Sequence, residues 1–246
     1  MQSRALRVRQ SSDDSVPTPL GAPKCLRRHL RRHEILHSAG GPFIALFAVR
    51  LGHLKSLALS DDGLVQITDF LMASDVLGLD GIDTGYHQSE VVALDDAEVF
   101  VLPYAKCEHW SRASAYGQRQ MARMLAFKGE RSREHMFMLG TMHTEQKLAT
   151  FLLDLSERYG RLGYSRSQFV LRMTRQEIGS YLGLKLETVS RALSDLQQQG
   201  IIQLQGRSVA LLDFSALWRI SGTSRDRQMP TMAPILNQEG ELLAVA

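Results

Sequence analysis

Three polar residues in the C-terminal half have the types and the spacing to read a nucleic acid. Glu187, Ser190 and Arg191 lie at positions i, i+3 and i+4, so a helix places them on one face. There, an arginine fork can donate to O6 and N7 of guanine, a glutamate can accept from N4 of cytosine, and a serine can bond to a base or a phosphate. In the segment LKLETVSRALSDLQQQG, at 184–200, the apolar residues fall on the opposite face. The apolar face is therefore expected to pack against the protein core, and the polar face to contact a nucleic acid.

The neighbouring elements predict how this helix is held. Thr174 followed by Glu177 has the spacing of a capping box and predicts the start of a short helix. A tight turn over 183–185 then leads into the quoted helix, and two short strands follow around Gln205 and Gly206. Helix, turn, helix and hairpin form a winged helix-turn-helix, whose second helix enters the DNA major groove. This context favours base reading over the alternative, in which the glutamate and arginine form only a surface ion pair.

Further DNA contacts are expected around the same face. Leu186 can touch a thymine methyl group, and basic side chains nearby can bind phosphates, which position a protein without reading sequence. The alternative for each basic side chain is a solvated surface charge. The residues concerned are Leu186, Thr188, Arg172, Arg175, Lys185 and Arg207.

Charge is unevenly distributed along the 246 residues, although the net charge is only +3. Residues 41–110 hold three basic and eleven acidic side chains, whereas 111–246 hold eighteen basic and twelve acidic ones. This pattern favours a C-terminal half that meets a polyanion such as double-stranded DNA. No apolar run approaches the roughly 18–20 residues that span a bilayer, and the first twenty residues lack a secretory signal. We therefore expect a cytoplasmic protein without a membrane partner.

The expected fold is α+β. Residues 1–30 read as a flexible basic tail, and 31–110 as an antiparallel β-roll with strands at 43–50, 53–59, 64–71 and 89–103. A long helix is expected over 111–142. The winged helix-turn-helix is expected over 143–220, with its two helices at about 175–194, and an irregular tail over 221–246.

The long helix carries an imperfect apolar stripe. Thirty residues extend about 45 Å at 1.5 Å per residue, which is longer than a small domain needs. A homodimer joined through a coiled-coil-like contact would bury the stripe, and the alternative is packing on the chain's own β-roll. The stripe consists of Met121, Met124, Leu125, Met136 and Leu139.

The chain closely resembles the cyclic-AMP receptor/FNR superfamily of bacterial transcription regulators, in its FNR-like branch. The likeness covers about residues 31–218, through MTRQEIGSYLGLKLETVSRAL, GPFIALFAVRLGHLKSLALSDDGLVQITDF, LGLDGI and EVFVLP. The family's recognition pattern E-x-x-S-R is present, and Leu186 stands where the cyclic-AMP receptor has arginine. The resemblance implies a cyclic-nucleotide-binding-like β-roll, a dimerisation helix and a winged helix-turn-helix.

The same resemblance implies a function. A dimer would bind a TTGAT-like inverted repeat and activate or repress genes in response to oxygen or redox state. RNA polymerase would be contacted through an exposed β-roll turn, whose other interpretation is a plain hairpin; it comprises Ser60, Asp61, Asp62 and Gly63. An enzyme is not expected, because the chain has no Ser-His-Asp order, Gly-rich phosphate loop or HExxH motif.

The sensor departs from the family in two ways. The FNR-type [4Fe–4S] cluster uses an N-terminal cysteine trio and one internal cysteine, but this chain has only Cys25 and Cys107, and Phe100 occupies the internal position. The cyclic-nucleotide pocket uses a Gly-Glu pair and a later Arg-Ser, whereas Gly78-Leu79-Asp80 and an arginine-free HQSEVVAL stand here. No cofactor is predicted, neither cluster nor cyclic AMP.

One further ligand set has the right residue types. Cys25, His29, His33 and His37 recur every four residues and would line one stripe of a helix, where they could hold zinc or haem. The interleaved arginine pairs oppose a cation and favour a solvated basic arm. The signal stays open between an atypical oxygen centre, a cyclic-nucleotide-type or other ligand, thiol redox chemistry, and control by abundance alone.

Overall fold

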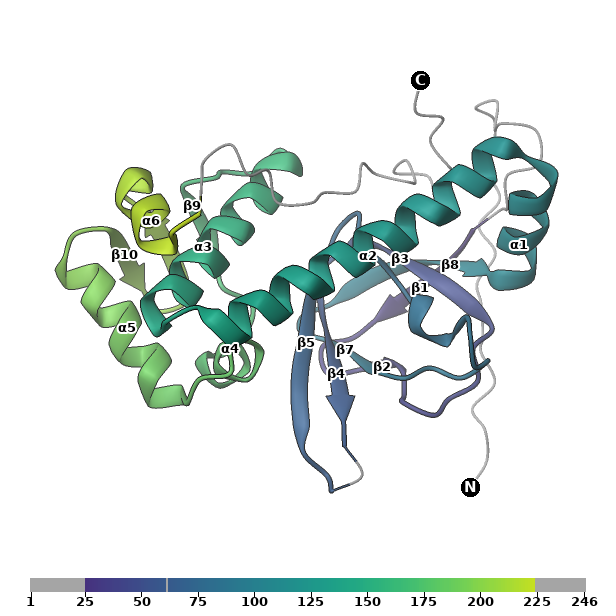
Figure 1. The fold of residues 1–246 in the computed structure, drawn as a ribbon, viewed down its shortest axis with the longest axis horizontal. Coiled ribbons are helices and arrows are strands. Elements are labelled where there is room, and N and C mark those ends of the chain that lie inside the picture. The colour runs from purple at the N-terminus through teal and green to yellow at the C-terminus, as the bar shows by residue number, and fades with distance from the viewer. Residues whose placement is uncertain (1–24, 61, 224–246) are drawn as a thin grey trace. The chain divides into compact units, whose positions relative to one another are not determined.

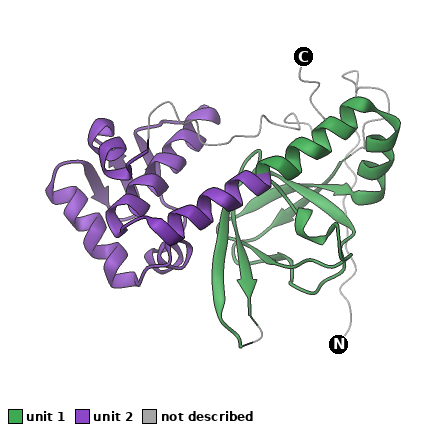
Figure 2. Ribbon diagram, in the orientation of Figure 1, with its two compact units in different colours: residues 1–127, 232–246 green, residues 128–231 purple. Residues whose placement is uncertain are grey.

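The computed structural model describes residues 25–60 and 62–223 (Figure 1). The chain divides into two compact units, residues 1–127 with 232–246 and residues 128–231 (Figure 2). We call them the first and the second unit. The helix α2 (Ala115–Thr141) begins in the first unit and ends in the second.

The first unit is built from two antiparallel four-stranded sheets, with strand orders β1-β8-β3-β6 and β2-β7-β4-β5. Its strands are β1 (Leu26–Leu30), β2 (Ile35–His37), β3 (Ala45–Leu51), β4 (His53–Leu59), β5 (Val65–Met72), β6 (Val76–Leu77), β7 (Glu90–Ala93) and β8 (Ala97–Pro103). Leu54, Val91 and Val99 are almost fully buried in a core to which both sheets contribute. Together with the helices described below, these sheets confirm the expected α+β class and antiparallel roll.

Gly52 is the corner at which the chain passes from one sheet to the other. Its φ is 83°, and a Cβ atom there would lie 2.6 Å from the carbonyl oxygen of Asp96. Only glycine combines that backbone conformation with so close a neighbour.

The hairpin between β4 and β5 has the turn that the sequence predicts. The N–H of Gly63 donates to the carbonyl of Ser60 at 2.9 Å, and Gly63 adopts a φ of 78°. Ser60, Asp62 and Gly63 are described, and Asp61 lies outside the described residues.

The expected tail over 1–30 is wrong for its last residues, because Leu26–Leu30 form β1. Leu26 lies opposite Val101 of β8 and Leu30 opposite Ala97. The pairing partner is about seventy positions away in the chain, so no local sequence pattern predicts the strand.

Within residues 25–60 and 62–223, no group of three or more histidine, cysteine or acidic side chains could hold a metal ion.

The proposed helical stripe of cysteine and histidines is also wrong, because the segment is extended. The side chain of His29, on β1, is 78% exposed, whereas His37 lies on β2 in the other sheet. His33 stands between the two strands with a φ of 67°. Strand geometry therefore separates residues that a helix would have aligned.

The helix expected over 111–142 is instead two helices, α1 (Tyr104–Ala113) and α2, with an extended Ser114 between them. Two of its five stripe residues pack within the first unit: Met124 is 5% exposed against Trp110, and Met121 packs beside them. Gly117 makes this close packing possible, since a Cβ atom there would lie 2.8 Å from the indole ring of Trp110.

The other stripe residues differ in exposure. Leu125 is 48% exposed and Met136 is 66% exposed, whereas Leu139 is half-buried beside Gly183 of the second unit. Met124 is thus buried within its own chain, whereas Met121 and Leu139 are half-buried, and their assignment to a dimer contact stays a prediction.

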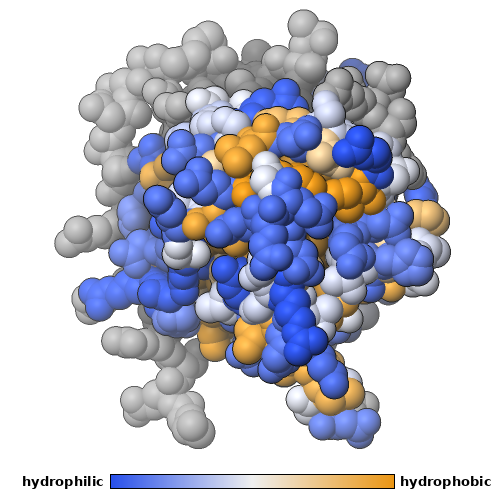
Figure 3. All heavy atoms as spheres, turned by 90° about the vertical axis from the view of Figure 1, so that its left-hand side faces the viewer, coloured by the Kyte–Doolittle hydropathy of each residue, from blue (hydrophilic) through white to orange (hydrophobic). Residues whose placement is uncertain are grey.

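The second unit contains the end of α2, four further helices and a three-stranded sheet of order β10-β11-β9. Its elements are α3 (Thr144–Arg161), β9 (Gln168–Val170), α4 (Arg175–Leu182), α5 (Leu186–Gln198), β10 (Ile202–Gln205), β11 (Ser208–Leu211) and α6 (Phe214–Ser221). Figure 3 looks onto this unit, whose visible face is mostly hydrophilic with apolar patches between. No helix among the described residues is both long enough and apolar enough to cross a membrane.

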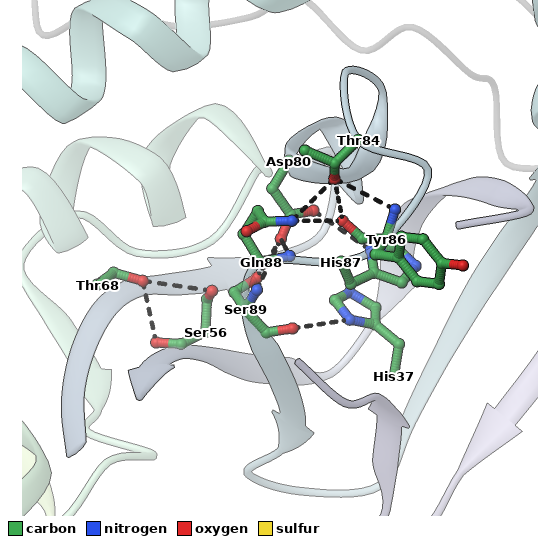
Figure 4. A network of polar contacts seen from close by, with 9 residues as sticks. All are labelled: His37, Ser56, Thr68, Asp80, Thr84, Tyr86, His87, Gln88 and Ser89. Atoms are coloured by element: carbon green, nitrogen blue, oxygen red, sulfur yellow. Dashed lines mark hydrogen bonds and ion pairs between the residues drawn. The ribbon is translucent and has the colours of Figure 1, made fainter. Parts of the chain in front are cut away.

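A stacked pair of histidine rings lies in the first unit, with His87 buried and His37 half-buried (Figure 4). The rings of His37 and His87 stack with centroids 3.7 Å apart, and the Nδ1–H of His37 donates to the carbonyl of Ser89 at 3.1 Å. Burial, together with the nearby His87 and Arg28, lowers the pKa of His37 from 6.5 to about 4, although Asp80 and the hydrogen bond to Ser89 act in the opposite direction. His37 is therefore neutral in the folded protein at neutral pH.

We expect the free energy of unfolding to fall as the pH drops from 6.5 towards 4. In this window the unfolded chain binds a proton at residue 37 that the folded chain does not bind, so acid favours unfolding. His37→Asn keeps a donor for Ser89 but does not titrate. Urea unfolding across this window should show a smaller loss for His37→Asn than for the unmodified protein. The exposed His33→Asn is the control, and equal losses in all three proteins would contradict the assignment.

Candidate nucleic-acid interface

The first helix of the predicted motif begins at the expected cap. The hydroxyl of Thr174 accepts the N–H of Glu177 at 3.2 Å, and the N–H of Thr174 donates to the Glu177 carboxylate at 2.6 Å. This reciprocal pair is the capping box that the sequence indicates. It fixes where α4 starts and therefore which of its residues face the core.

The turn between α4 and α5 is set by two glycines. Gly183 ends α4 in the left-handed conformation, with a φ of 64°, as the sequence predicts. Gly179 was not singled out from the sequence, although a glycine inside a helix costs about 1 kcal/mol relative to alanine and thus invites an explanation. The N–H of Leu184 donates to the carbonyl of Gly179 at 2.8 Å, and a Cβ atom on Gly179 would lie 2.6 Å from the carbonyl oxygen of Leu184. Any side chain at position 179 would push the turn away.

The helix α5 has the two faces that its sequence predicts. Its buried face consists of Val189, Ala192, Leu193 and Leu196. Glu187 and Arg191 are exposed, Ser190 and Thr188 are half-buried, and Leu186 is 45% exposed. In the part of the chain that the structure describes, Glu187 and Arg191 form no ion pair with each other, so both stay available to a ligand.

The basic candidates lie on the elements next to α5 in the chain. Lys185 precedes α5 and is exposed. Arg207 lies in the turn of the β10–β11 hairpin, and its Nη1 donates to the carbonyl of Arg172 at 3.4 Å while its own carbonyl accepts the N–H of Leu171 at 2.8 Å. Arg175 begins α4, and its Nη1 is buried with no hydrogen-bond partner among the described residues. These contacts join the hairpin to the segment that leads into α4.

Contacts within the second unit hold the end of α2 against α3 and α4, and sequence reasoning missed them. The Nε2–H of His135 donates to the carbonyl of Tyr181 at 2.8 Å, and the two rings stack at 4.1 Å. Arg131 on α2 and Arg158 on α3 approach the buried Asp154 carboxylate at 3.4 and 3.5 Å. A cavity of about 210 Å³ lies among these residues. No spacing in the sequence links residues so far apart, which is why they were not predicted.

The two thiols of the chain lie in one apolar cluster of the first unit. Cys107 is 4% exposed, on α1, and Cys25 packs against the same cluster, which includes the buried Phe100. Burial, with a smaller effect from the nearby Cys107, raises the pKa of Cys25 to about 12, and burial raises the pKa of Cys107 to about 11. Both thiols are therefore protonated at neutral pH.

Comparisons with known proteins agree with this geometry. Residues 146–220 match the Crp-like helix-turn-helix domain, and residues 27–112 match the cyclic nucleotide-binding domain. The transcriptional regulatory protein btr of Bordetella pertussis is 40% identical, covering 80% of this chain and 81% of that protein. The anaerobic regulatory protein of Pasteurella multocida is 35% identical, covering 81% of this chain and 73% of that protein.

A solved structure is also similar to this chain. FixK2 from Bradyrhizobium japonicum has 30% sequence identity and a TM-score of 0.75, covering 82% of this chain and 99% of that chain. The relatives are transcriptional regulators rather than enzymes. With its matched domains, its relatives and the two-faced helix after a glycine turn, the chain belongs to the CRP/FNR family of DNA-binding transcriptional regulators.

Proposed function

We propose that this protein binds a TTGAT-like inverted repeat as a homodimer and activates or represses genes that respond to oxygen or redox state. The observation that carries the proposal is the exposed polar face of α5, with Glu187, Ser190 and Arg191 on a helix whose other face is buried. The relative named as an anaerobic regulatory protein supports the choice of target genes.

Each residue of this face has a role in the proposal. Arg191 reads guanine and Glu187 accepts from cytosine, while Ser190 binds a neighbouring base or phosphate. Leu186, 45% exposed at the start of α5, contacts a thymine methyl group. Thr188 is half-buried at the edge of the face and has room only for a peripheral contact.

Phosphates are bound by the basic residues around α5. Lys185 and Arg207 lie at the start of the helix and in the hairpin turn, and Arg172 is exposed beside Arg207. Arg175 is half-buried at the start of α4, so any phosphate contact is made by the accessible part of its guanidinium rather than by its buried Nη1.

The homodimer is formed through α2 in this proposal. Leu125, Met136 and Phe137 on this helix are 48%, 66% and 54% exposed, so together they leave apolar surface in contact with water. Burying them against the same helix of a second copy removes this apolar surface from water.

RNA polymerase is contacted through the β4–β5 turn in this proposal. Ser60, Asp62 and Gly63 present polar groups at the hairpin end, and Leu64 beside them is 72% exposed. Asp61, the fourth residue of this set, lies outside the described residues.

The chain does not fit a resident [4Fe–4S] cluster. Such clusters take four thiolates, whereas this protein has two cysteines, and the buried Phe100 fills the position of an internal ligand. Both thiols also have a raised pKa, which makes them poor nucleophiles towards oxidants. These observations favour a second candidate for the regulation, in which the abundance of the protein, rather than a sensor within it, sets its activity.

Replacing Arg191 tests the base-reading face. Arg191→Ala should lose the preference for the guanine of TTGAT, because a bidentate arginine contributes about 1–3 kcal/mol of discrimination. Fluorescence anisotropy with the palindrome, and with a palindrome changed at that base pair, measures the preference. Arg219→Ala removes an exposed positive charge from α6 instead, and should keep the preference. Retained discrimination in Arg191→Ala would refute the assignment.

Charges placed on the exposed part of α2 test the dimer. Leu125→Glu with Met136→Glu should give a monomer by light scattering, since paired like charges cannot be buried in a symmetric contact. Leu51→Glu changes a similarly exposed leucine of β3 and should leave the dimer intact. A monomeric unmodified protein, or a dimer in the doubly substituted variant, would count against α2 as the joint.

Anaerobic purification tests the sensor. We expect a colourless, iron-free protein that binds the palindrome equally well with and without air, because neither a cluster nor a reactive thiolate is available. The absorption spectrum, an iron assay and binding isotherms in both atmospheres measure this. Iron-dependent colour, or binding that air abolishes, would contradict control by abundance.

A further inference from the structure

Four hydrogen-bond donors from three consecutive residues converge on the carboxylate of Asp80 (Figure 4). The N–H groups of Gln88 and Ser89 lie 3.0 and 2.9 Å from its Oδ2, and the Ser89 hydroxyl lies 2.7 Å from the same atom. The Nδ1–H of His87 donates to Oδ1 at 3.3 Å. We call these four donors the anion seat.

The turn that carries Asp80 is held in place from both sides. Gly78 has a φ of 91°, and a Cβ atom there would lie 3.1 Å from the carbonyl oxygen of Ala45. A Cβ atom on Gly81 would lie 2.6 Å from Phe43. The short helical turn η1 (Leu79–Gly81) therefore fits only with glycine on either side of its acidic residue.

The loop that carries the anion seat is also preorganised. The side-chain amide of Gln88 donates to Thr84 Oγ1 at 2.9 Å and to the carbonyl of Tyr86 at 2.8 Å. The N–H of His87, a residue only 3% exposed, donates to the carbonyl of Gly41 at 2.9 Å. Because the loop is fixed by its own bonds, the donors point to one place whether or not an external ligand is present.

Consecutive backbone N–H groups with a hydroxyl form a concavity that binds phosphate or carboxylate oxygens. The charge state of Asp80 agrees with its role as the bound anion. Burial raises the pKa of Asp80, but hydrogen bonds from Ser89 and His87, together with the charges of the histidines, lower it by more, so its pKa lies below the ordinary value. Its carboxylate is therefore ionised at neutral pH.

The surroundings disfavour an external phosphate. Residues 78–94 contain no lysine or arginine that could pair with it, and Asp83 and Glu90 add negative charge. Arg28, whose charge acts on His37, already donates to the carbonyls of Leu36 and Ile35. Yet the loop lies inside the segment matched to the cyclic nucleotide-binding domain. The geometry points to Asp80 as an internal ligand: its carboxylate fills the anion seat, so this domain is complete without a cyclic nucleotide and takes none up.

Removing the carboxylate tests the proposal on the full-length protein. In thermal unfolding, cyclic AMP should not shift the Tm of the unmodified protein, and inorganic phosphate should shift it only through the basic residues of the second unit, which are the same in every variant. Asp80→Ala should have a lower Tm, and phosphate should raise it with the logarithm of its concentration, because an empty anion seat binds an external anion. Asp83→Ala removes an exposed charge from the same loop and should behave like the unmodified protein.

If Asp80→Ala does not fold, hydrogen exchange in the unmodified protein tests whether the Asp80 carboxylate occupies the anion seat. The amides of Gln88 and Ser89 should exchange slowly, since the carboxylate holds them, and cyclic AMP should not change their rates. A saturable stabilisation of the unmodified protein by cyclic AMP would overturn the proposal. So would fast exchange of both amides, or an anion response in Asp80→Ala no larger than in Asp83→Ala. None of these measurements involves DNA, so they are independent of the proposed operator.

Discussion

The DNA-binding surface depends on the close approach of two backbone segments, at Gly179 and Leu184. The hydrogen bond between them and the absence of a Cβ atom at position 179 set the angle at which α5 leaves α4. Once that angle is fixed, the buried residues of α5 determine which side of the helix is exposed. The Gly179–Leu184 contact thus orients the polar face of α5, although neither residue belongs to that face.

The two units use polar groups in opposite ways. In the second unit, Glu187 and Arg191 stay exposed and do not pair with each other, which leaves their hydrogen-bonding capacity for a ligand. In the first unit, Asp80 and its four donors satisfy one another in a half-buried site. An unpaired buried charge would be strongly destabilising, so a self-sufficient pocket is also a stable one. The polar face of α5 is exposed, whereas the donors of the anion seat are occupied by the carboxylate of Asp80.

Sequence reasoning succeeded where structure is decided locally. Caps, glycine turns and helical periodicity act over a few residues, so the end of α4 at Gly183 and the two faces of α5 were predicted. The strand Leu26–Leu30 was missed because its partner is distant in the chain, and Met124 was assigned to a dimer because its contact with Trp110 depends on the break between α1 and α2. The donors around Asp80 come from backbone geometry, which residue types alone do not reveal.

The end of α2 belongs to the second unit, where Arg131 and His135 tie it to α3 and α4. In a dimer joined through this helix, no flexible linker separates the joint from the surface that reads bases. Such a protein binds only half-sites that lie at a fixed distance and rotation from each other. One extra base pair between half-sites rotates one of them by roughly 35° about the DNA axis, because a full turn takes about 10.5 base pairs. In the proposed dimer, the contacts of Arg131 and His135 would thus make the spacing of the half-sites part of what is recognised.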